Sequence, residues 1–593
     1  MTTLGQHLVD QILPPKWRTG DAALTKSSLN ESLVRLAKEH PETYPDIVTR
    51  LKRLGDEVAT LEGISVGLDD IAPHPERDAM LAPHVEAFRR AGTKQDKEKA
   101  LFAAQDAMLN LAKRDKGAMG EMVRSGGRGN AAQLMRAVGS PVLARDSKGK
   151  TVPWLISKSF SEGLSPADAW VAGGEARVNA VLSNISVVEP GDLAKILINN
   201  MGDKLVTMPD CGTKNGVMMH GTDSHIIDRY EAVTNRLITP QLASKLAADN
   251  KEVVVRSPMT CEAPHGICQK CQGLDFTGKP HTIGTNVGMR AAQALSEPLT
   301  QFSLNAKHGG RVAAAVSDKK QLEGIKGVRQ LLEIPTSFLH KAVLAERDGT
   351  VSKVDAAPQG GFYVHVDDAR HYVPPDQRVV VEPGQSLFAG DVLSDGVPRP
   401  DEVVHHKGLG EGRRYLVDAI HDVYKRAGAD IDKRHLETLA RSVLNHVQII
   451  DPGPDDAFMK GDVVDYNRFR AALDHTRRTV PLNEAVGETL AKDAFHFTAG
   501  TRVTPAVIDT LTRRGTRTLD IVDHGPAASP MMRPASRTPL LNPDWMARLG
   551  HRYLKETLLA GAHRGDVADI HGYSPVPAYA AGSEFGTGAE GRY

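Results

Sequence analysis

The four cysteines of this chain have a spacing that is typical of a metal site. Cys261, Cys268 and Cys271 follow a C-x6-C-x2-C pattern, and Cys211 precedes them in the sequence PDCGT. Thiolates are preferred ligands of zinc, and four of them close a tetrahedral structural site that leaves no position for a substrate. The sequence therefore predicts a structural Zn²⁺ on all four cysteines. Two alternatives stay open: scattered buried thiols, and His265 as a substitute ligand.

A second group of residues that could do chemistry lies in the segment QFSLNAKH, residues 301–308. Leu304 and His308 are four positions apart, so they share one face of a helix, with Gln301 and Asn305 beside them. Histidine changes charge near neutral pH and is a frequent proton donor in catalysis. Taken alone, the same pattern also fits an ordinary amphipathic helix with an exposed histidine.

The composition of the 593 residues is that of a soluble globular protein with several domains, with 40% hydrophobic and 25% charged residues. Lys plus Arg and Asp plus Glu both number 73, which gives no support to wholesale attraction to nucleic acid or membranes but leaves local basic patches open. No apolar run reaches the length of a membrane span, and the start MTTLGQHLVDQILPPKW lacks a secretory pattern. We therefore expect a cytoplasmic protein whose cysteines bind metal rather than form disulfides.

The periodicity of the chain predicts a mixed α+β fold dominated by helices. We expect helices over 1–62 and a charged helical hairpin over 78–122, with a short β-like run at 63–71 between them. Longer helical segments are predicted at 159–185, interrupted at Pro166 and Gly173-Gly174, and at 288–308, broken at Pro298. Strands separated by Gly and Asp turns are expected over 340–396, and a helix–turn–helix over 413–444.

The cysteine pattern, followed by AAQALSEPLTQFSLNAKHGG, resembles the largest (beta-prime) subunit of multisubunit RNA polymerases. Further resemblances follow the family's order along roughly residues 40–580. RSGGRGNAAQLMRAVG (124–139) resembles the F-loop, SFSEGLSPADAWVAGGEARVNAVLSNI (159–185) the bridge helix, and GQSLFAGDVLSDG a barrel-sandwich segment. YLVDAIHDVYKRAGADIDKRHLETLARSVL resembles the C-terminal clamp and switch region. The shared order of these motifs identifies the chain as similar to a C-terminal part of that subunit.

The resemblance implies a division of the chain into seven regions. These are a helical secondary-channel or rim-helix region (1–122), an F-loop and bridge-helix region (123–202), a zinc-binding region (203–287), a trigger loop with flanking helices (288–339), a β-rich barrel-sandwich or jaw-like segment (340–400), a C-terminal clamp and switch region (401–580) and a disordered tail (581–593).

The resemblance also implies roles for individual residues in nucleotide addition. His308 would approach the phosphates of the incoming nucleotide, Leu304 would pack on its base, and Asn305 and Gln301 would read its ribose. Arg177 in the bridge-helix segment would contact template phosphate or brace the helix, although a surface ion pair is an open alternative. Arg124 and Arg128 in the F-loop are expected to be structural braces.

The chain departs from the family at several positions. The Asp-triad loop that holds catalytic Mg²⁺ in the family's double-psi barrel does not occur in this sequence, so we expect a split subunit with those ligands on a partner chain. Val178 follows Arg177 where two basic residues are common, and Leu304, Asn305 and Lys307 replace common residues of bacterial enzymes. This divergence leads us to expect a bacteriophage polymerase, in the host cytoplasm and with virion packaging as an option.

The resemblance implies an enzyme, a DNA-directed RNA polymerase that is active only as a complex. Its expected partners are the chain with the Asp triad, a beta-like second-largest subunit, a specificity factor, DNA template, RNA product and nucleoside triphosphates. Two other readings stay open. The chain could be a non-catalytic, zinc-containing nucleic-acid-binding regulator of transcription, or an inactive structural remnant.

Overall fold

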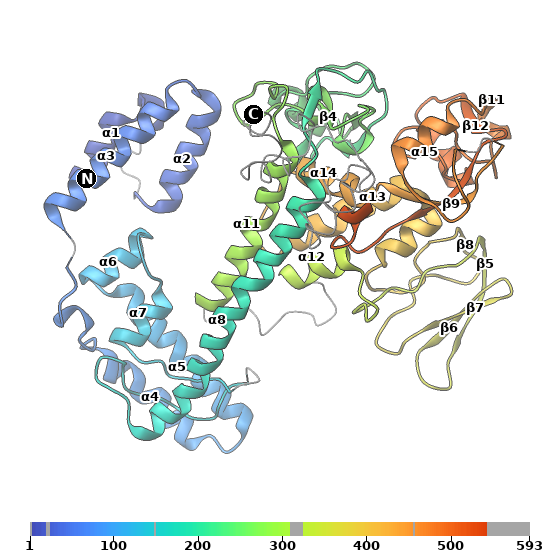
Figure 1. Ribbon diagram of the computed structural model, residues 1–593. Helices are drawn as coiled ribbons and strands as arrows, with labels where there is room; N and C mark the ends of the chain where they lie inside the picture. Colours follow the sequence, from blue (N-terminus) through green and yellow to red (C-terminus); the bar gives the residue numbers. More distant parts are fainter. Residues whose placement is uncertain are drawn as a thin grey trace, which may run out of the picture. The chain divides into compact units, whose positions relative to one another are not determined.

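The computed structural model describes residues 3–18, 24–63, 65–146, 150–308, 324–454 and 457–541 (Figure 1). Within its helices, the side chains at 27, 38, 178–179, 181–187 and 301–308 are outside this description. The chain forms two compact units: unit 1 comprises Met1–Ser186 and Leu304–Ala315, and unit 2 comprises Val187–Ser303 and Val316–Tyr593. The predicted loop after His308 and the predicted disordered tail, 581–593, lie outside the described residues.

The first part of unit 1 is built from helices, as the periodicity of the sequence predicts. The β-like run predicted at 63–71 is wrong, because the structure has a 3-10 turn there, η2. The elements are α1 Leu4–Ile12, η1 Pro15–Trp17, α2 Lys26–Glu39, α3 Tyr44–Glu62, η2 Asp69–Ile71, α4 Arg77–Arg90, α5 Lys94–Arg114, α6 Ala118–Ser125 and α7 Ala131–Val138.

The hairpin predicted over 78–122 is confirmed by helices α4 and α5, with a turn at residues 91–93 between them. Thr93 begins α5, since its hydroxyl accepts the Asp96 backbone N–H at 3.1 Å. One side of α5 is apolar and packs with α4 and α7 into a core that includes Leu81, Leu101 and Leu134. The remaining side chains of the hairpin, rich in charge, face water.

The long helix predicted at 159–185 has different bounds in the structure. Helix α8 runs over Pro166–Met201, starting in unit 1 and continuing into unit 2. Pro166 begins the helix rather than breaking it, because the first turn does not use the missing N–H. Gly173 and Gly174 also lie inside α8; glycine weakens a helix by about 1 kcal/mol relative to alanine, which is too little to end one of this length.

The helix α11, Val287–His308, continues through Pro298, so the predicted break there is wrong. Proline removes one backbone hydrogen bond and crowds the preceding turn. In that turn, the Tyr424 hydroxyl donates to the Leu295 carbonyl at 2.5 Å, which supplies a side-chain partner next to the disturbed backbone. Tertiary contacts of this kind allow the helix to pass the proline.

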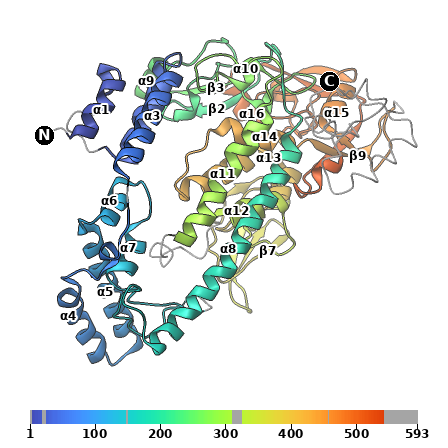
Figure 2. The same cartoon turned by 60° about the vertical axis from the view of Figure 1, so that its left-hand side comes forward.

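Within unit 2, α11 lies beside the last turns of α8 (Figures 1 and 2). Leu193, Leu197 and Met201 of α8 share one buried core with Ala292 and Leu295 of α11. The Asn286 side chain donates to the Gly202 carbonyl at 2.8 Å and accepts the Met289 N–H at 2.8 Å, so it joins the end of α8 to the start of α11. The two helices are therefore fixed to each other at this end.

Gly288 makes this close approach possible, and we expect Gly288→Ala to destabilise unit 2. A β-carbon at Gly288 would lie 1.8 Å from the Met201 carbonyl oxygen, so the helices would have to move apart. Overpacking of this kind costs about 1–3 kcal/mol. Urea unfolding measures the change, with Gly191→Ala in α8 as control, because a β-carbon there meets nothing within 4 Å. Equal stability of the two variants would contradict the packing role.

Unit 2 also contains five small sheets, counted over the described residues. The strands predicted over 340–396 are confirmed by a four-stranded antiparallel sheet in the order β7-β6-β5-β8, whose buried face includes Val351, Val364 and Val373. The strands are β1 Val206–Met208, β2 Val217–His220, β3 Glu252–Val255, β4 Ile267–Cys268, β5 Gly349–Ala356, β6 Phe362–Val366, β7 Ala369–Val373, β8 Ser386–Leu387, β9 His446–Asp451, β10 Val463–Asp465, β11 Arg477–Pro481, β12 Thr518–Val522 and β13 Ala527–Met531.

The helix–turn–helix predicted over 413–444 is confirmed by α13 and α14, although α13 begins earlier and is kinked at Gly408. Leu416, Ile420, Leu436 and Leu439 bury their apolar faces in the main core of unit 2. The remaining elements of this unit are η3 Ser224–Ile226, α9 Pro240–Ala248, η4 Pro258–Thr260, α10 Gln269–Gln272, α12 Gly324–Glu333, α13 Pro400–Arg426, α14 Lys433–Val443, α15 Tyr466–Leu473, η6 Leu482–Glu484, α16 Pro505–Thr512 and η7 Thr538–Leu541. The predicted mixed, helix-rich fold class is thus confirmed.

Candidate metal centre and the polymerase-like region

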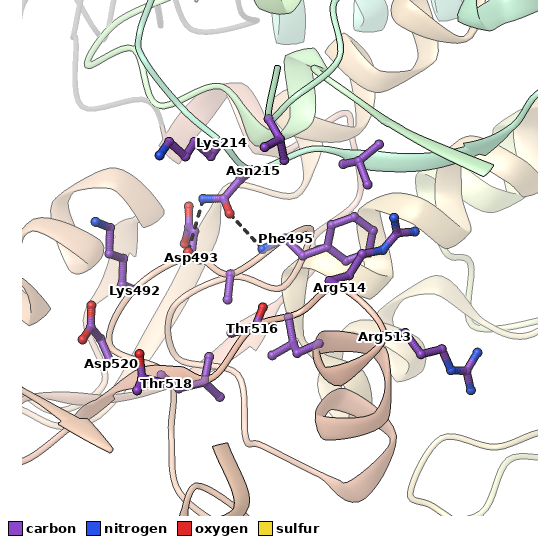
Figure 3. Close-up of a pocket in the computed structure, with 15 residues that line it drawn as sticks. Lys214, Asn215, Lys492, Asp493, Phe495, Arg513, Arg514, Thr516, Thr518 and Asp520 are labelled. Atoms are coloured by element: carbon purple, nitrogen blue, oxygen red, sulfur yellow. Dashed lines mark hydrogen bonds between the residues drawn. The ribbon is translucent and has the colours of Figure 1, made fainter. Parts of the chain in front are cut away.

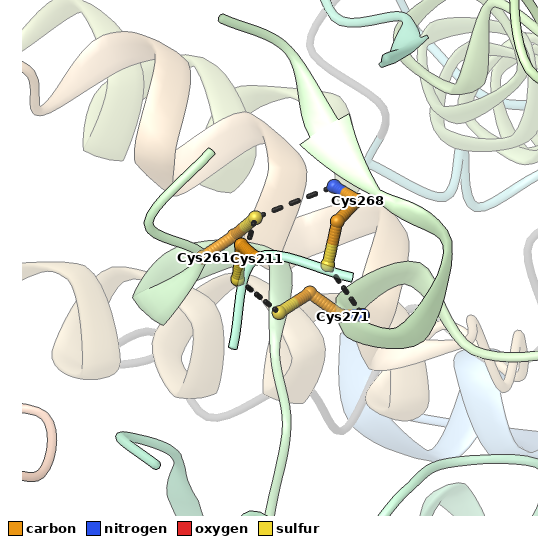
Figure 4. A group of neighbouring side chains, drawn as sticks. All are labelled: Cys211, Cys261, Cys268 and Cys271. Carbon is orange, nitrogen blue, oxygen red and sulfur yellow. Dashed lines mark hydrogen bonds between the residues drawn. The ribbon is translucent and has the colours of Figure 1, made fainter. Parts of the chain in front are cut away.

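The structure brings the four cysteines together, and their sulfur atoms all lie within 4.8 Å of one another (Figure 4). Strands β1 and β4 pair in parallel, with Met208 opposite Cys268, so the loop after β1 carries Cys211 to the knuckle formed by the other three. His265 is exposed and is not part of the cluster. The four cysteines therefore lie in one cluster and are not scattered thiols, and their role as zinc ligands stays a prediction.

The distances between these sulfurs fit a tetrahedral ion. Cys211 Sγ lies 3.7 Å from Cys271 Sγ and 3.8 Å from Cys261 Sγ. Zinc–sulfur bonds of about 2.3 Å at tetrahedral angles would place the sulfurs about 3.8 Å apart. The donor set and its geometry thus suit Zn²⁺ in a closed site.

Backbone groups of the knuckle point at the sulfurs. The Cys268 N–H donates to Cys261 Sγ, and the Cys271 N–H donates to Cys268 Sγ, both at 3.3 Å. Gly266 precedes this turn with a φ of 61°, and a β-carbon there would lie 2.2 Å from the Leu205 carbonyl oxygen. The turn therefore needs glycine, and its N–H groups stabilise negative charge on the sulfurs.

Arg256 is a part of this centre that the sequence interpretation missed. Its side chain is only 2% exposed, pairs with Asp210 at 2.6 Å, and approaches the sulfurs of Cys211, Cys271 and Cys268 at 3.2, 3.4 and 3.5 Å. A cluster of four thiolates around a divalent ion carries excess negative charge, which this guanidinium offsets. The signal in the sequence was an arginine inside the apolar run VVVRSPM, residues 253–259, shortly before Cys261.

The four thiols of the cluster do not ionise equally. Burial raises the pKa of the Cys271 thiol well above its ordinary value. Hydrogen bonds from the neighbouring thiols, Cys211 first, hold the pKa of Cys261 well below its ordinary value. The cluster can therefore hold a thiolate beside protonated partners, and a divalent cation is what would allow all four to ionise together.

A cavity of 510 Å³ lies between the loop after Cys211 and the C-terminal sheet of unit 2 (Figure 3). Asn215 lines this cavity. Its side chain donates to the Asp493 carbonyl at 3.2 Å and accepts the Phe495 N–H at 2.8 Å. The Arg514 guanidinium stacks on the Phe495 ring at 5.0 Å. The Asn215 contacts tie the cysteine-bearing loop to the loop at 493–495, and the predicted site residues lie elsewhere.

The arginines predicted from the F-loop and bridge-helix segments are all exposed. Arg124 donates to the Asp115 carbonyl, which joins α6 to the end of α5 and agrees with a bracing role. Arg128 lies in the turn that precedes α7. Arg177 lies on α8 with no ion-pair partner among the residues that the structure describes. The phosphate contact of Arg177 stays a prediction.

The motif SFSEGL holds the start of α8 in place through Glu162. The Glu162 carboxylate accepts the Ser159 N–H at 2.8 Å and forms an ion pair with the buried Arg77 at the start of α4. The Arg77 hydrogen bond lowers the pKa of Glu162 to about 2, from an ordinary value of 4.5. Sequence reasoning found the motif but not this partner, which lies 85 positions away.

We expect Glu162→Gln to destabilise unit 1 at neutral pH but not in strong acid. The depressed pKa means that the carboxylate stabilises the folded state fully above pH 4.5, and that this contribution is lost as the pH falls through about 2. Urea unfolding followed by tryptophan fluorescence at several pH values measures the difference between wild type and variant. A difference that does not shrink on acidification would contradict the ion pair's role.

The four residues predicted to act in catalysis lie near the end of α11. The structure gives the helical backbone for Gln301, Leu304, Asn305 and His308, but their side chains are outside the described residues. Their roles therefore stay predictions.

The sequence of this chain is similar to those of known proteins. Residues 163–360 and 365–462 match the family model of RNA polymerase Rpb1, domain 5. This polymerase-like region contains α8, the four cysteines and α11, which are the elements described above.

Bacterial relatives named DNA-directed RNA polymerase subunit beta' extend the similarity over more of the chain. The protein of Heliobacterium modesticaldum is 28% identical over 79% of this chain, and that of Symbiobacterium thermophilum is 28% identical over 87%. The Staphylococcus aureus protein is 29% identical over 73%. The chain spans 44%, 48% and 39% of the lengths of these relatives. The matches support a C-terminal part of the largest subunit of a DNA-directed RNA polymerase.

None of the helices in the described ranges combines the length and the apolar character needed to cross a bilayer.

Proposed function

We propose that this chain is the beta-prime-like C-terminal part of the largest subunit of a DNA-dependent RNA polymerase and contributes directly to nucleotide addition. The observation that carries the proposal is the match of residues 163–360 and 365–462 to an RNA polymerase family model, because these residues include α8, the cysteine cluster and α11. The order of these elements agrees with the order of the motifs in the sequence.

In this proposal, α8 is the bridge helix and the end of α11 begins the trigger loop. Arg177 is exposed on α8, where a planar guanidinium is suited to a phosphate of the template. His308 would stabilise or protonate the developing charge on the phosphates, while Leu304 and Asn305 would hold base and ribose. Closure over a matched nucleotide would link its selection to its reaction.

The metals in this proposal have different roles. Zinc on the four cysteines would be structural, since four thiolates leave no open coordination position. Magnesium would assist attack by the RNA 3′ hydroxyl and departure of pyrophosphate, and its carboxylate ligands are expected on a partner chain. The beta-like subunit, the specificity factor and a bacteriophage origin remain predictions of the resemblance.

The experiment that tests the proposal is RNA-primer extension on a DNA scaffold by the native complex, compared with the complex reconstituted without this chain. We expect extension to require this chain, Mg²⁺ and nucleoside triphosphates. Scaffold binding by the native complex without any extension would contradict the proposal and would favour the non-catalytic regulator.

A further inference from the structure

A second group of metal-ligating side chains lies in unit 2, away from the cysteines. His225 in η3, His421 in α13 and Asp430 in the loop before α14 place their ligand atoms within 4.8 Å of one another. His225 Nε2 lies 3.1 Å and His421 Nε2 lies 3.5 Å from the same oxygen, Asp430 Oδ1. Two imidazoles and a carboxylate are a common ligand set for zinc and related transition metals.

The strongest sign of a ligand is the state of His421. Its side chain is only 10% exposed, and among the described residues its buried Nε2 atom has the long ion-pair contact with Asp430 Oδ1, at 3.5 Å, but no well-formed hydrogen bond. A buried polar atom with only this long contact is poorly satisfied, and an ion bound between the two residues would satisfy it. The His421 and His225 rings lie edge to face, with their centroids 5.2 Å apart.

The distances suit an ion placed among the three residues. With metal–ligand bonds of about 2.1 Å, the two separations from Asp430 Oδ1 correspond to angles of roughly 95° and 110° at the metal. Both values are compatible with tetrahedral or more highly coordinated geometry. Three protein ligands also leave at least one position open to water, in contrast to the closed cysteine site.

The surrounding structure fixes the ligands before any ion binds. The Asp223 carboxylate accepts the His225 backbone N–H at 3.0 Å and pairs with Lys433 at 2.9 Å, which offsets the charge of that ammonium. Gly428, with a φ of 87°, turns the chain at the end of α13 and so returns Asp430 toward His421. The residues come from the region predicted to bind zinc, from α13 and from the loop between α13 and α14.

We propose that His225, His421 and Asp430 form a second, transition-metal site that ties the zinc-binding region to the α13–α14 hairpin. An ion there would join segments that are 205 positions apart in the chain. Because it would bind the folded state and not the unfolded one, it would raise the stability of unit 2. The inference does not depend on the polymerase role of the chain.

The test is to count the zinc bound by the full-length chain during a Zn²⁺ titration, using elemental analysis after removal of free metal. The wild type should bind two equivalents: one on the cysteines and one on the histidines and Asp430. Asp430→Asn should retain the first and weaken the second at least about 100-fold, since loss of a ligand exceeds the usual 10–100-fold effect of an outer partner. Asp430 is 67% exposed, so the amide should leave the fold intact.

Asp422→Asn is the matched control, because it removes the same charge from an exposed position of α13 next to His421. It should bind both equivalents with wild-type affinity. A His225→Gln and His421→Gln double variant should also lose the second equivalent while keeping the first. A wild type that binds a single equivalent would overturn the proposal and leave a His–Asp ion pair. An Asp430→Asn variant that binds the second equivalent with wild-type affinity would also overturn the proposal.

Discussion

Replacing His308 with alanine is expected to lower the rate of nucleotide addition by about 10²- to 10³-fold while the polymerase complex stays assembled. General acid catalysis and preorganised charge stabilisation each contribute effects of about this size. Because the imidazole would act mainly on the reacting phosphates, the loss should fall on the rate at saturating nucleotide more than on the affinity for it. Single-nucleotide addition, measured by rapid quench over a range of nucleotide concentrations, separates the two.

His524→Ala is the matched control for this prediction. His524 lies in the turn between β12 and β13, its side chain is 86% exposed, and it has no proposed role in the reaction. It should extend the primer at the wild-type rate. If His308→Ala also extends at that rate, the assignment of α11 to the trigger loop is wrong.

Replacing Cys268 with serine is expected to remove the proposed zinc ion from the cysteines and to unfold the region predicted to bind it, residues 203–287. Cys268 is fully buried, and its sulfur accepts the Cys271 N–H and lies 3.5 Å from Arg256. Structural zinc sites contribute apparent binding free energies of about 10–16 kcal/mol, so their loss exceeds the stability of most domains. The expected results are loss of the thiolate-to-metal absorption of the Co²⁺-substituted protein and rapid proteolysis between residues 203 and 287.

His265→Asn distinguishes the two ligand sets that the sequence left open. The structure places this exposed histidine outside the cysteine cluster, so the variant should keep its thiolate-bound metal and its resistance to proteolysis. Loss of the metal in this variant would mean that His265, and not all four cysteines, completes the site.

The cysteine cluster could be predicted from the sequence because its ligands have a distinctive residue type and a short spacing. Three of them share one knuckle, and Cys211 was the remaining cysteine of the chain. Arg256 was not predicted, because its position inside the apolar run VVVRSPM indicates burial but does not show which group the guanidinium contacts. The His225, His421 and Asp430 group was missed for a related reason, since its members are common residues that only the tertiary fold brings together.

The positions of helices were predictable from periodicity, but their ends were not. Pro166, Gly173 and Pro298 each suggested an interruption, and the structure continues or begins a helix at all three. Proline and glycine weaken a helix by about 1–3 kcal/mol per residue. This cost is small compared with the free energy that a long helix gains by burying its apolar face in a core. The role of Gly288, in contrast, could not be predicted from the sequence. A β-carbon is excluded at this position because the backbone of α8 lies so close, and that contact is known only from the structure.

The central claim is that the end of α11 closes on the incoming nucleotide. The most direct measurement is photo-crosslinking in a stalled elongation complex, using a nucleoside triphosphate with a photoreactive base and mapping the modified peptide by mass spectrometry. The account predicts a crosslink within residues 301–308 of this chain that disappears when an unlabelled matched nucleotide competes. Crosslinks confined to other subunits, in a complex that extends its primer normally, would contradict it.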